Sequence, residues 1–210
     1  ETQGIVNMNL DFLPLKSYSN IVEGNALRLD WSSVISPDKL HYIMGNPPFL
    51  GYSMQDKSQK ADILSVYVDE KGKSYKTAGK IDYVAGWYFK AAEIMQNTSI
   101  RTAFVSTNSI CQGEQVASVW KPLYERFGIH IDFAWRTFKW ASESNEQAHV
   151  HVIIVGFSNN AVTDKFLMEN DRQKLADTPT LFRETKNPDS YIVVPRVSSE
   201  NRRYIPVGFL

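Results

Sequence analysis

The 210-residue sequence lacks several features on which other classes of protein depend. A single cysteine, Cys111, excludes an internal disulfide and a zinc site built from several cysteines, and it suits a reducing compartment. No apolar run is long enough to cross a membrane. The formal net charge is zero, so composition alone does not predict a nucleic-acid-binding surface. We therefore expect a cytoplasmic protein that holds no metal and does not enter a membrane.

The sequence does contain enough apolar material for a folded core. Hydrophobic residues make up 43% of the chain and aromatic residues 12%, so long disorder is not expected. Neither end resembles a natural terminus, because the chain begins at Glu1 and stops at Leu210 within an apolar run. We expect a fragment of a larger protein, with one domain and the start of a second.

Apolar segments alternate along the chain as in an open α/β sheet with helices on its faces. Strands are expected over residues 20–24, 41–44, 102–107, 129–134 and 150–157. Helices are expected over residues 81–97 and 113–127, with Gly128 as a C-cap, and residues 50–80 form a polar excursion with one short helix. The last two strands follow each other without a helix, which predicts an antiparallel pair at the sheet edge.

The character of the sequence changes after Asn160. Short segments, prolines and scattered arginines replace the alternation of strands and helices. This composition predicts the start of a β-rich domain. We therefore expect a first domain over residues 1–160 and part of a second over residues 161–210.

The sharpest motif is Asn46-Pro47-Pro48-Phe49, at the end of a predicted strand. An exocyclic amine on a base is a poor nucleophile, because its lone pair is delocalised into the ring, and acceptors for its hydrogens make it more reactive. The Asn46 side-chain oxygen and the Pro47 carbonyl can supply two acceptors, and proline holds that carbonyl in place in advance. Phe49 offers a flat face for a base. A plain turn is the alternative, but ligands of open α/β sheets bind at such strand ends.

A second loop, Gly24-Asn25-Ala26-Leu27, also follows an apolar segment. Gly24 permits close approach of a ligand, and Asn25 can form a hydrogen bond with an adenine edge. Alone, this loop is best explained as a turn. Two such loops, each at a strand end, favour a binding site.

Two further stretches accompany these loops: Asp82-Tyr83-Val84-Ala85-Gly86-Trp87-Tyr88-Phe89-Lys90-Ala91-Ala92 and Phe104-Val105-Ser106-Thr107-Asn108-Ser109. Together they resemble the N6-adenine DNA methyltransferases, and more closely the MmeI-like group, where methyltransferase and nuclease share one polypeptide in bacterial restriction-modification. The likeness spans most of residues 20–157, and residues 173–210 resemble the start of that group's target-recognition region. The resemblance implies a partial class I (Rossmann-like) methyltransferase core with antiparallel edge strands. It also implies S-adenosylmethionine as cofactor and double-stranded DNA as partner.

The resemblance further assigns roles to single residues. The flipped adenine would be held by Asn46, Pro47, Pro48 and Phe49, and the adenine of the cofactor would lie at Gly24, Asn25 and Ala26. An aromatic residue would sandwich the target base, and of Phe138 and Trp140 we prefer Phe138. The Gly-rich loop and the acidic residue that hold the rest of the cofactor are expected upstream of residue 1, so the fragment alone is expected to be inactive. Residues are also expected to be missing near Asn160.

Several alternatives stay open at this stage. The phosphate backbone of DNA could be gripped by Lys57, Lys60, Arg202 and Arg203, but nearby acidic residues make a solvated surface about as good an explanation for the lysines. A methyltransferase acting on protein glutamine or on RNA would use the same Asn-Pro-Pro-aromatic chemistry. A non-catalytic DNA-binding module is the remaining alternative.

Overall fold

A computed structural model describes residues 21–140, 150–161, 165–170, 179–184, 192–194 and 205–207. Its strands are β1 (Tyr42–Gly45), β2 (Arg101–Thr107), β3 (His130–Trp140), β4 (Val150–Ser158), β5 (Phe166–Asn170), β6 (Pro179–Glu184), β7 (Ile192–Val194) and β8 (Ile205–Val207). Its α-helices are α1 (Trp31–Val34), α2 (Lys57–Val66), α3 (Ala85–Ile94) and α4 (Gly113–Phe127). Short 3-10 turns are η2 (Pro37–Lys39), η3 (Tyr52–Met54), η4 (Ala78–Lys80) and η5 (Asn108–Cys111). Within these described residues, no helix is both long and apolar enough to cross a membrane.

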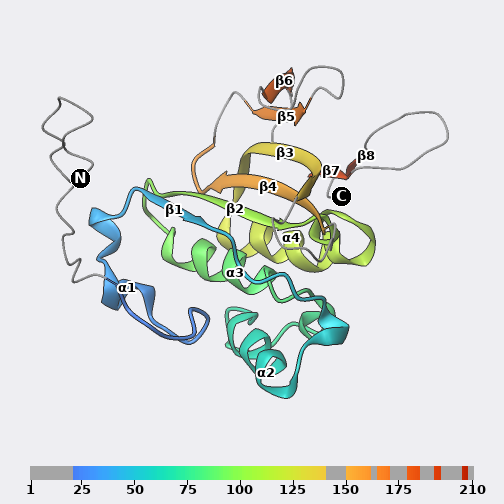
Figure 1. Cartoon of the computed structure of the whole chain (residues 1–210). Helices are drawn as coiled ribbons and strands as arrows, with labels where there is room; N and C mark the ends of the chain where they lie inside the picture. The colour runs from blue at the N-terminus through green and yellow to red at the C-terminus, as the bar shows by residue number, and fades with distance from the viewer. Residues whose placement is uncertain are drawn as a thin grey trace, which may run out of the picture.

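The main sheet has the strand order β1-β2-β4-β3-β5-β6 (Figure 1). β1 runs parallel to β2, and β4 runs antiparallel to both β2 and β3. The expected α/β class is thus confirmed, and so is the antiparallel pairing of the last two predicted strands. That pair does not form the edge, however, because β5 pairs with β3 and carries β6 beyond it. The domain division at Asn160 stays a prediction, and β5 on its far side joins the same sheet.

Three predicted elements differ from the structure. The strand expected over residues 129–134 continues to Trp140 as β3. No strand forms over residues 21–24, and the side chains of Ile21 and Val22 are 81% and 50% exposed. The helix expected from residue 81 begins only at Ala85. Residues 81–84 do not form a first helical turn, and one of them bonds to another segment instead. The Tyr83 N–H donates to the Leu50 carbonyl, directly after the Asn-Pro-Pro-Phe motif, at 2.9 Å.

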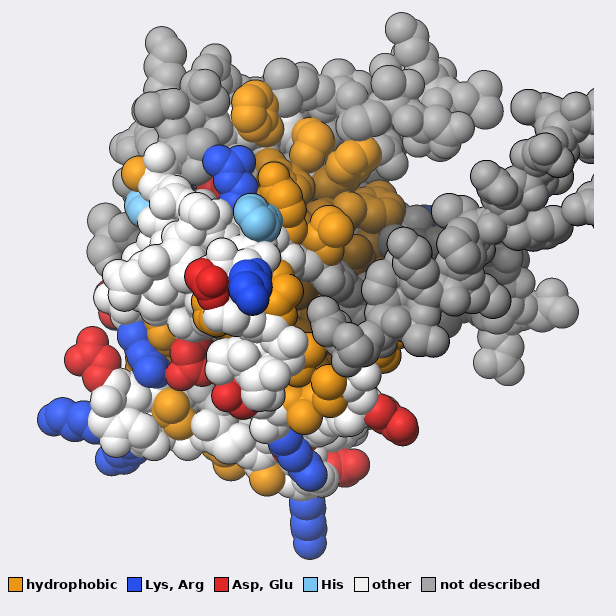
Figure 2. Space-filling view, turned by 90° about the vertical axis from the view of Figure 1, so that its left-hand side faces the viewer, with side chains coloured by type: hydrophobic (Ala, Val, Ile, Leu, Met, Phe, Trp, Pro, Cys, Tyr) orange, Lys and Arg blue, Asp and Glu red, His pale blue; other side chains and the backbone are white. Residues whose placement is uncertain are grey.

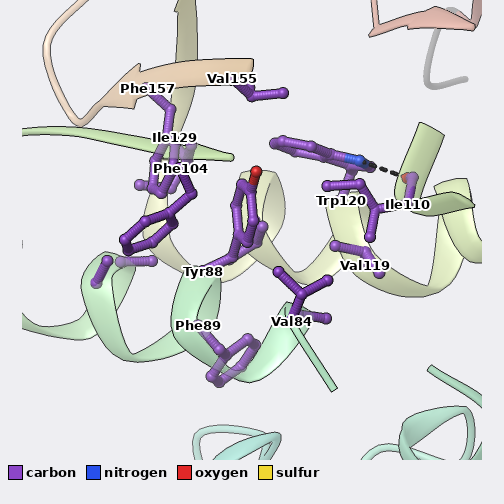
Figure 3. Packing of buried hydrophobic residues seen from close by; sticks show 14 of the residues in the cluster. Val84, Tyr88, Phe89, Phe104, Ile110, Val119, Trp120, Ile129, Val155 and Phe157 are labelled. Atoms are coloured by element: carbon purple, nitrogen blue, oxygen red, sulfur yellow. Dashed lines mark hydrogen bonds between the residues drawn. The ribbon is translucent and has the colours of Figure 1, made fainter. Parts of the chain in front are cut away.

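Helices α3 and α4 lie against one face of the sheet, and α2 lies beyond α3 (Figure 1). Tyr88 of α3 stands at the centre of the resulting core (Figure 3). Its ring stacks on Phe157 of β4 with a centroid distance of 5.1 Å, and it meets Phe104 and Trp120 edge-on. The Tyr88 hydroxyl shares a 2.7 Å hydrogen bond with Ser106, so this polar group is paired inside the core.

Glycine is required at two places in this frame. Gly128 ends α4 with a φ of 60°, and its N–H bonds to carbonyls of the last helical turn, as predicted for a C-cap. Gly156 of β4 lies opposite Phe133 of β3, whose ring covers the glycine so closely that a Cβ there would lie 2.0 Å from the ring. The strand pair β3/β4 is therefore built around an aromatic ring packed on bare backbone.

Candidate active site

The Asn-Pro-Pro-Phe motif leaves the sheet at the carboxyl end of β1. The last strand residue, Gly45, pairs with Phe104 of β2, whose ring would lie 3.3 Å from a Cβ on Gly45. Asn46 follows directly and is exposed, whereas Pro47 is buried. The buried proline fixes the backbone beneath an accessible carboxamide. The structure therefore places Asn46 at a strand end, where the side chain can reach a ligand.

The chain after the motif is fastened to the segment that precedes α3. Pro48 is exposed and Phe49 is half-buried. Besides the bond between Tyr83 and the carbonyl of Leu50, the buried Gln55 side chain donates to the Ile81 carbonyl at 3.0 Å. These bonds hold the motif loop, residues 46–52, and the turn that follows it against residues 81–83.

Asp82 adds a third connection. Its carboxylate is 7% exposed and accepts hydrogen bonds from the Tyr52 N–H, at 3.0 Å, and from the Ser109 hydroxyl. Ser109 belongs to η5, which follows the carboxyl end of β2. The Asp82 N–H in turn donates to the Gln115 side chain of α4 at 3.2 Å. One buried carboxylate thus joins the loops that follow two neighbouring parallel strands.

The second loop of interest, residues 24–29, is called the cofactor loop below, after the role that the sequence resemblance predicts for it. Asn25 is exposed, yet both ends of its carboxamide are engaged. Its Oδ1 accepts from the Leu27 N–H at 2.9 Å, and its Nδ2 donates to Asp62 Oδ2 at 2.8 Å. The Asn25 amide also interacts with the Tyr83 hydroxyl, and one lone pair on Oδ1 remains for a ligand.

Asp62 of α2 is 4% exposed and accepts hydrogen bonds from three side chains. Besides Asn25, the donors are Arg28 Nε at 2.6 Å and the Tyr83 hydroxyl at 3.0 Å. Burial opposes ionisation, but these hydrogen bonds outweigh it, and the pKa of Asp62 lies below its ordinary value. The carboxylate is therefore charged at neutral pH and matched by the Arg28 guanidinium.

The remaining contacts of the cofactor loop explain its sequence. A Cβ on Gly24 would lie 3.1 Å from the Leu29 side chain, so the space beside this glycine is filled by packing within the loop. The Ala26 carbonyl accepts from the Trp31 indole N–H at 2.9 Å. Lys90 of α3 donates to the carbonyls of two loop residues, Leu27 and Leu29. The loop is thus clamped by both α2 and α3.

The candidates for stacking on the target base lie on β3. Phe138 is half-buried and meets Trp135 edge-on, with ring centroids 6.4 Å apart. The pairing with β4 is irregular between these two residues, as in a β-bulge, which re-aims side chains. Trp140 ends the strand opposite Val150, and its side chain lies outside the described residues. Their stacking role stays a prediction.

The basic candidates are divided between described and undescribed parts. Lys57 and Lys60 are exposed on α2, whose first turn is closed by a capping box between Asp56 and Gln59. Basic and acidic side chains are interspersed on the face shown in Figure 2 and form no single basic stripe there. Arg202 and Arg203 lie outside the described residues. Over the described part of the chain, no group of three or more His, Cys, Asp or Glu side chains could hold a metal ion.

Comparison with known proteins connects this geometry to a family. The model of the MmeI DNA-methyltransferase domain matches residues 1–169, and that of the MmeI target recognition domain matches residues 136–210. The chain belongs to the MmeI DNA-methyltransferase family. The resemblance inferred from the sequence motifs is thereby confirmed.

Two relatives of the MmeI family illustrate the extent of the match. DNA methyltransferase A of Bacillus subtilis (strain 168) is 39% identical over 166 residues, which cover 78% of this chain and 18% of that protein. The solved structure of the Type IIL restriction-modification enzyme MmeI in complex with DNA is 42% identical, with a TM-score of 0.74. That match covers 88% of this chain and 24% of the MmeI chain. The chain thus spans a quarter or less of either relative.

Two residues of the site were missed at the level of sequence. Asp62 is one of the acidic residues that lie near the lysines in the sequence, and Asp82 stands out only as part of a stretch similar to the family. The structure makes each a buried hydrogen-bond acceptor at the junction of loops. The available signal was weak: in each case the acid is followed directly by a buried apolar residue, Ile63 or Tyr83.

Proposed function

We propose that this chain is the catalytic part of a methyltransferase that transfers a methyl group from S-adenosylmethionine to the N6 amine of adenine in double-stranded DNA. The observation that carries the proposal is the exposed Asn46 above a buried Pro47, at the carboxyl end of β1 in an MmeI-family domain. The intact protein would act in the cytoplasm as part of a restriction-modification enzyme, with a nuclease domain in the same polypeptide.

The cofactor loop fits the adenine part of S-adenosylmethionine. The edge of adenine presents an amino donor and a ring-nitrogen acceptor. Asn25 retains one lone pair on an exposed carboxamide, which can accept a hydrogen bond from the amino group of that edge. When bound, the cofactor supplies an electrophilic methyl group on a sulfonium centre.

The motif residues act on the amine of the target base. Asn46 Oδ1 and the Pro47 carbonyl would accept its two hydrogens, which draws the nitrogen toward tetrahedral geometry and frees its lone pair. Phe49 would stack on the extruded base. Because the motif loop is fastened through Leu50 and Tyr52, these acceptors are held in place before the base arrives.

The DNA would be contacted at several further points. Phe138 or Trp140 would cover the other face of the flipped base. Phosphates would be contacted by Lys57, Lys60, Arg202 and Arg203, which adds salt-dependent affinity without sequence preference. Asparagine at position 46 favours adenine over cytosine as the target, since N4-cytosine enzymes more often carry serine there.

Replacing Asn46 in the intact protein tests the proposal. We expect Asn46→Ala to lower kcat for adenine methylation by about 100-fold or more, since one preorganised acceptor is lost. The melting temperature should be unchanged, because Asn46 is exposed. Asn160→Ala is the matched control: it is an exposed asparagine after β4, and Ser158 of that strand pairs with Arg101 at the opposite end of β2. Full adenine methylation by Asn46→Ala would contradict the assignment.

The choice of substrate is tested with the unaltered protein. Labelled S-adenosylmethionine is offered with duplex DNA, with RNA and with protein in parallel. Transfer to the adenine of duplex DNA is expected. Label in glutamine or in RNA, with none in DNA, would favour the other amino-methyltransferases, and no label in any substrate would favour a binding module.

A further inference from the structure

The polar segment that follows the catalytic motif returns to the cofactor loop. Helix α2 lies within this segment, and its buried Asp62 contacts Asn25 and Arg28 of the cofactor loop. The side chains of Ile63 and Leu27 pack together over Gly86 of α3, each 3.0 Å from the position of a Cβ on that glycine. The contact between α2 and the loop is thus both polar and apolar.

Asp62 determines which way the Asn25 carboxamide faces. An asparagine side chain can adopt two orientations that exchange its oxygen and nitrogen. In the observed one, Oδ1 faces the Leu27 N–H and Nδ2 faces the Asp62 carboxylate. In the reverse orientation, the Asn25 amide N–H would face the Leu27 N–H, and the Asn25 oxygen would face the Asp62 carboxylate, so neither hydrogen bond could form. The carboxylate therefore fixes the position at which the Asn25 oxygen offers an acceptor to a ligand.

Asp62 also connects the two loops of the site. Its Oδ2 accepts from the Tyr83 hydroxyl, and the Tyr83 N–H holds the Leu50 carbonyl directly after the motif. A chain of three hydrogen bonds, each between 2.8 and 3.0 Å, thus runs from Asn25 through Asp62 and Tyr83 to Leu50.

We propose that Asp62 is a positioning residue for S-adenosylmethionine, which acts by holding Asn25 in the orientation that matches the cofactor's adenine. The inference rests on the proposed role of Asn25 as an adenine contact. Asp62 itself does not touch the reacting atoms. Its effect should therefore be on cofactor affinity, with little effect on the rate of the chemical step.

The test is calorimetric titration of the intact protein with S-adenosylmethionine in the absence of DNA. Asp62→Asn keeps the size of the side chain but turns one acceptor oxygen into a donor, so it cannot satisfy all three donors. We expect the dissociation constant to rise about tenfold or more, with kcat at saturating cofactor and the affinity for duplex DNA within about twofold. Asp69→Asn is the control, because the Asp69 side chain accepts hydrogen bonds from the N–H groups of Lys71 and Lys73 within its own loop.

A double-mutant cycle with Asn25→Ala decides how Asp62 acts. If it acts through Asn25, adding Asp62→Asn to Asn25→Ala weakens binding no further. The inference is overturned if the two substitutions lower the cofactor affinity additively. It is also overturned if Asn25→Ala lowers this affinity and Asp62→Asn does not. Either result leaves the proposed function standing. If Asn25→Ala binds the cofactor as well as the unaltered protein, the adenine contact itself is wrong, and the inference fails with it.

A swapped pair tests the orientation where Asp62→Asn alone does not fold, because it restores the hydrogen bond between positions 25 and 62. Asn25→Asp alone sets two carboxylates against each other and should bind cofactor weakly. The variant that combines Asn25→Asp with Asp62→Asn restores a donor facing an acceptor. We expect it to bind more tightly than Asn25→Asp, and binding no tighter would count against the orientation argument.

Discussion

Removing the carboxylate of Asp82 should loosen the motif loop without disturbing the sheet. In Asp82→Ala, the Tyr52 N–H and the Ser109 hydroxyl both lose their acceptor. A hydrogen bond to a charged group contributes about 1.5 to 3 kcal/mol. Tyr52 is 45% exposed, so its N–H can turn to water and the loss is smaller there. We therefore expect the free energy of unfolding to fall by about 2 to 4 kcal/mol.

The looser motif loop should also lower kcat, so stability and catalysis are measured separately in the intact protein. Urea denaturation gives the free energy of unfolding, and methylation of duplex DNA at saturating cofactor gives kcat. Asp82→Asn retains one acceptor oxygen, and the Ser109 hydroxyl can accept from the new amide, so both losses should be clearly smaller. A surface substitution usually changes the free energy of unfolding by no more than about 0.5 kcal/mol. If Asp82→Ala changes it by no more than this and leaves kcat unaltered, then Asp82 does not fasten the loop.

Two further predictions concern the sheet. Gly156→Ala should lower the free energy of unfolding by about 1 to 3 kcal/mol, because the Phe133 ring must leave its place on β4, and adding Phe133→Leu should recover part of the loss in a denaturation series. Asp132 is buried, and burial raises its pKa although Ser158 donates to it. Above the raised pKa, the charged Asp132 lowers the free energy of unfolding. This loss disappears as the pH falls from the raised pKa toward the ordinary pKa of an aspartate, because the carboxyl becomes protonated in the folded protein. Asp132→Asn should be the more stable protein at neutral pH, and its advantage should shrink over that acidic window in thermal melts.

The sequence predicted best those elements whose signals are local. Helix α4 shows apolar residues at helical spacing and a glycine in the left-handed region at its end, and both its bounds were predicted. β2 is a run of alternately buried residues, and it too lies within a residue of the expected range. The motif at Asn46 was placed correctly at a strand end because two prolines cannot continue a strand. Each of these signals is contained within a few neighbouring residues.

The connections within the site could not be predicted in this way. Asn25 and Asp62 are 37 residues apart, and their contact depends on how α2 folds back over α3. An aspartate in a polar, lysine-rich stretch is ordinarily solvated, so its sequence context favours exposure. Burial of Asp62 is stabilised by Arg28, which the sequence places in another loop. The ion pair with Arg28, which offsets the cost of burying the Asp62 carboxylate, thus forms only in the tertiary structure.

The short helix α3 shows why local prediction fails where the two loops meet. Residues 81–84 continue the helical spacing of apolar side chains, and in a longer helix their carbonyls would accept hydrogen bonds from the next turn. Instead, the Tyr83 N–H holds Leu50, the Ile81 carbonyl accepts from Gln55, and the Asp82 carboxylate holds Tyr52. Because the proposed chemistry depends on positioning, a rigid attachment of the motif loop contributes more to function than one further helical turn. A helical pattern that the backbone does not follow thus marks the segment on which the site is assembled.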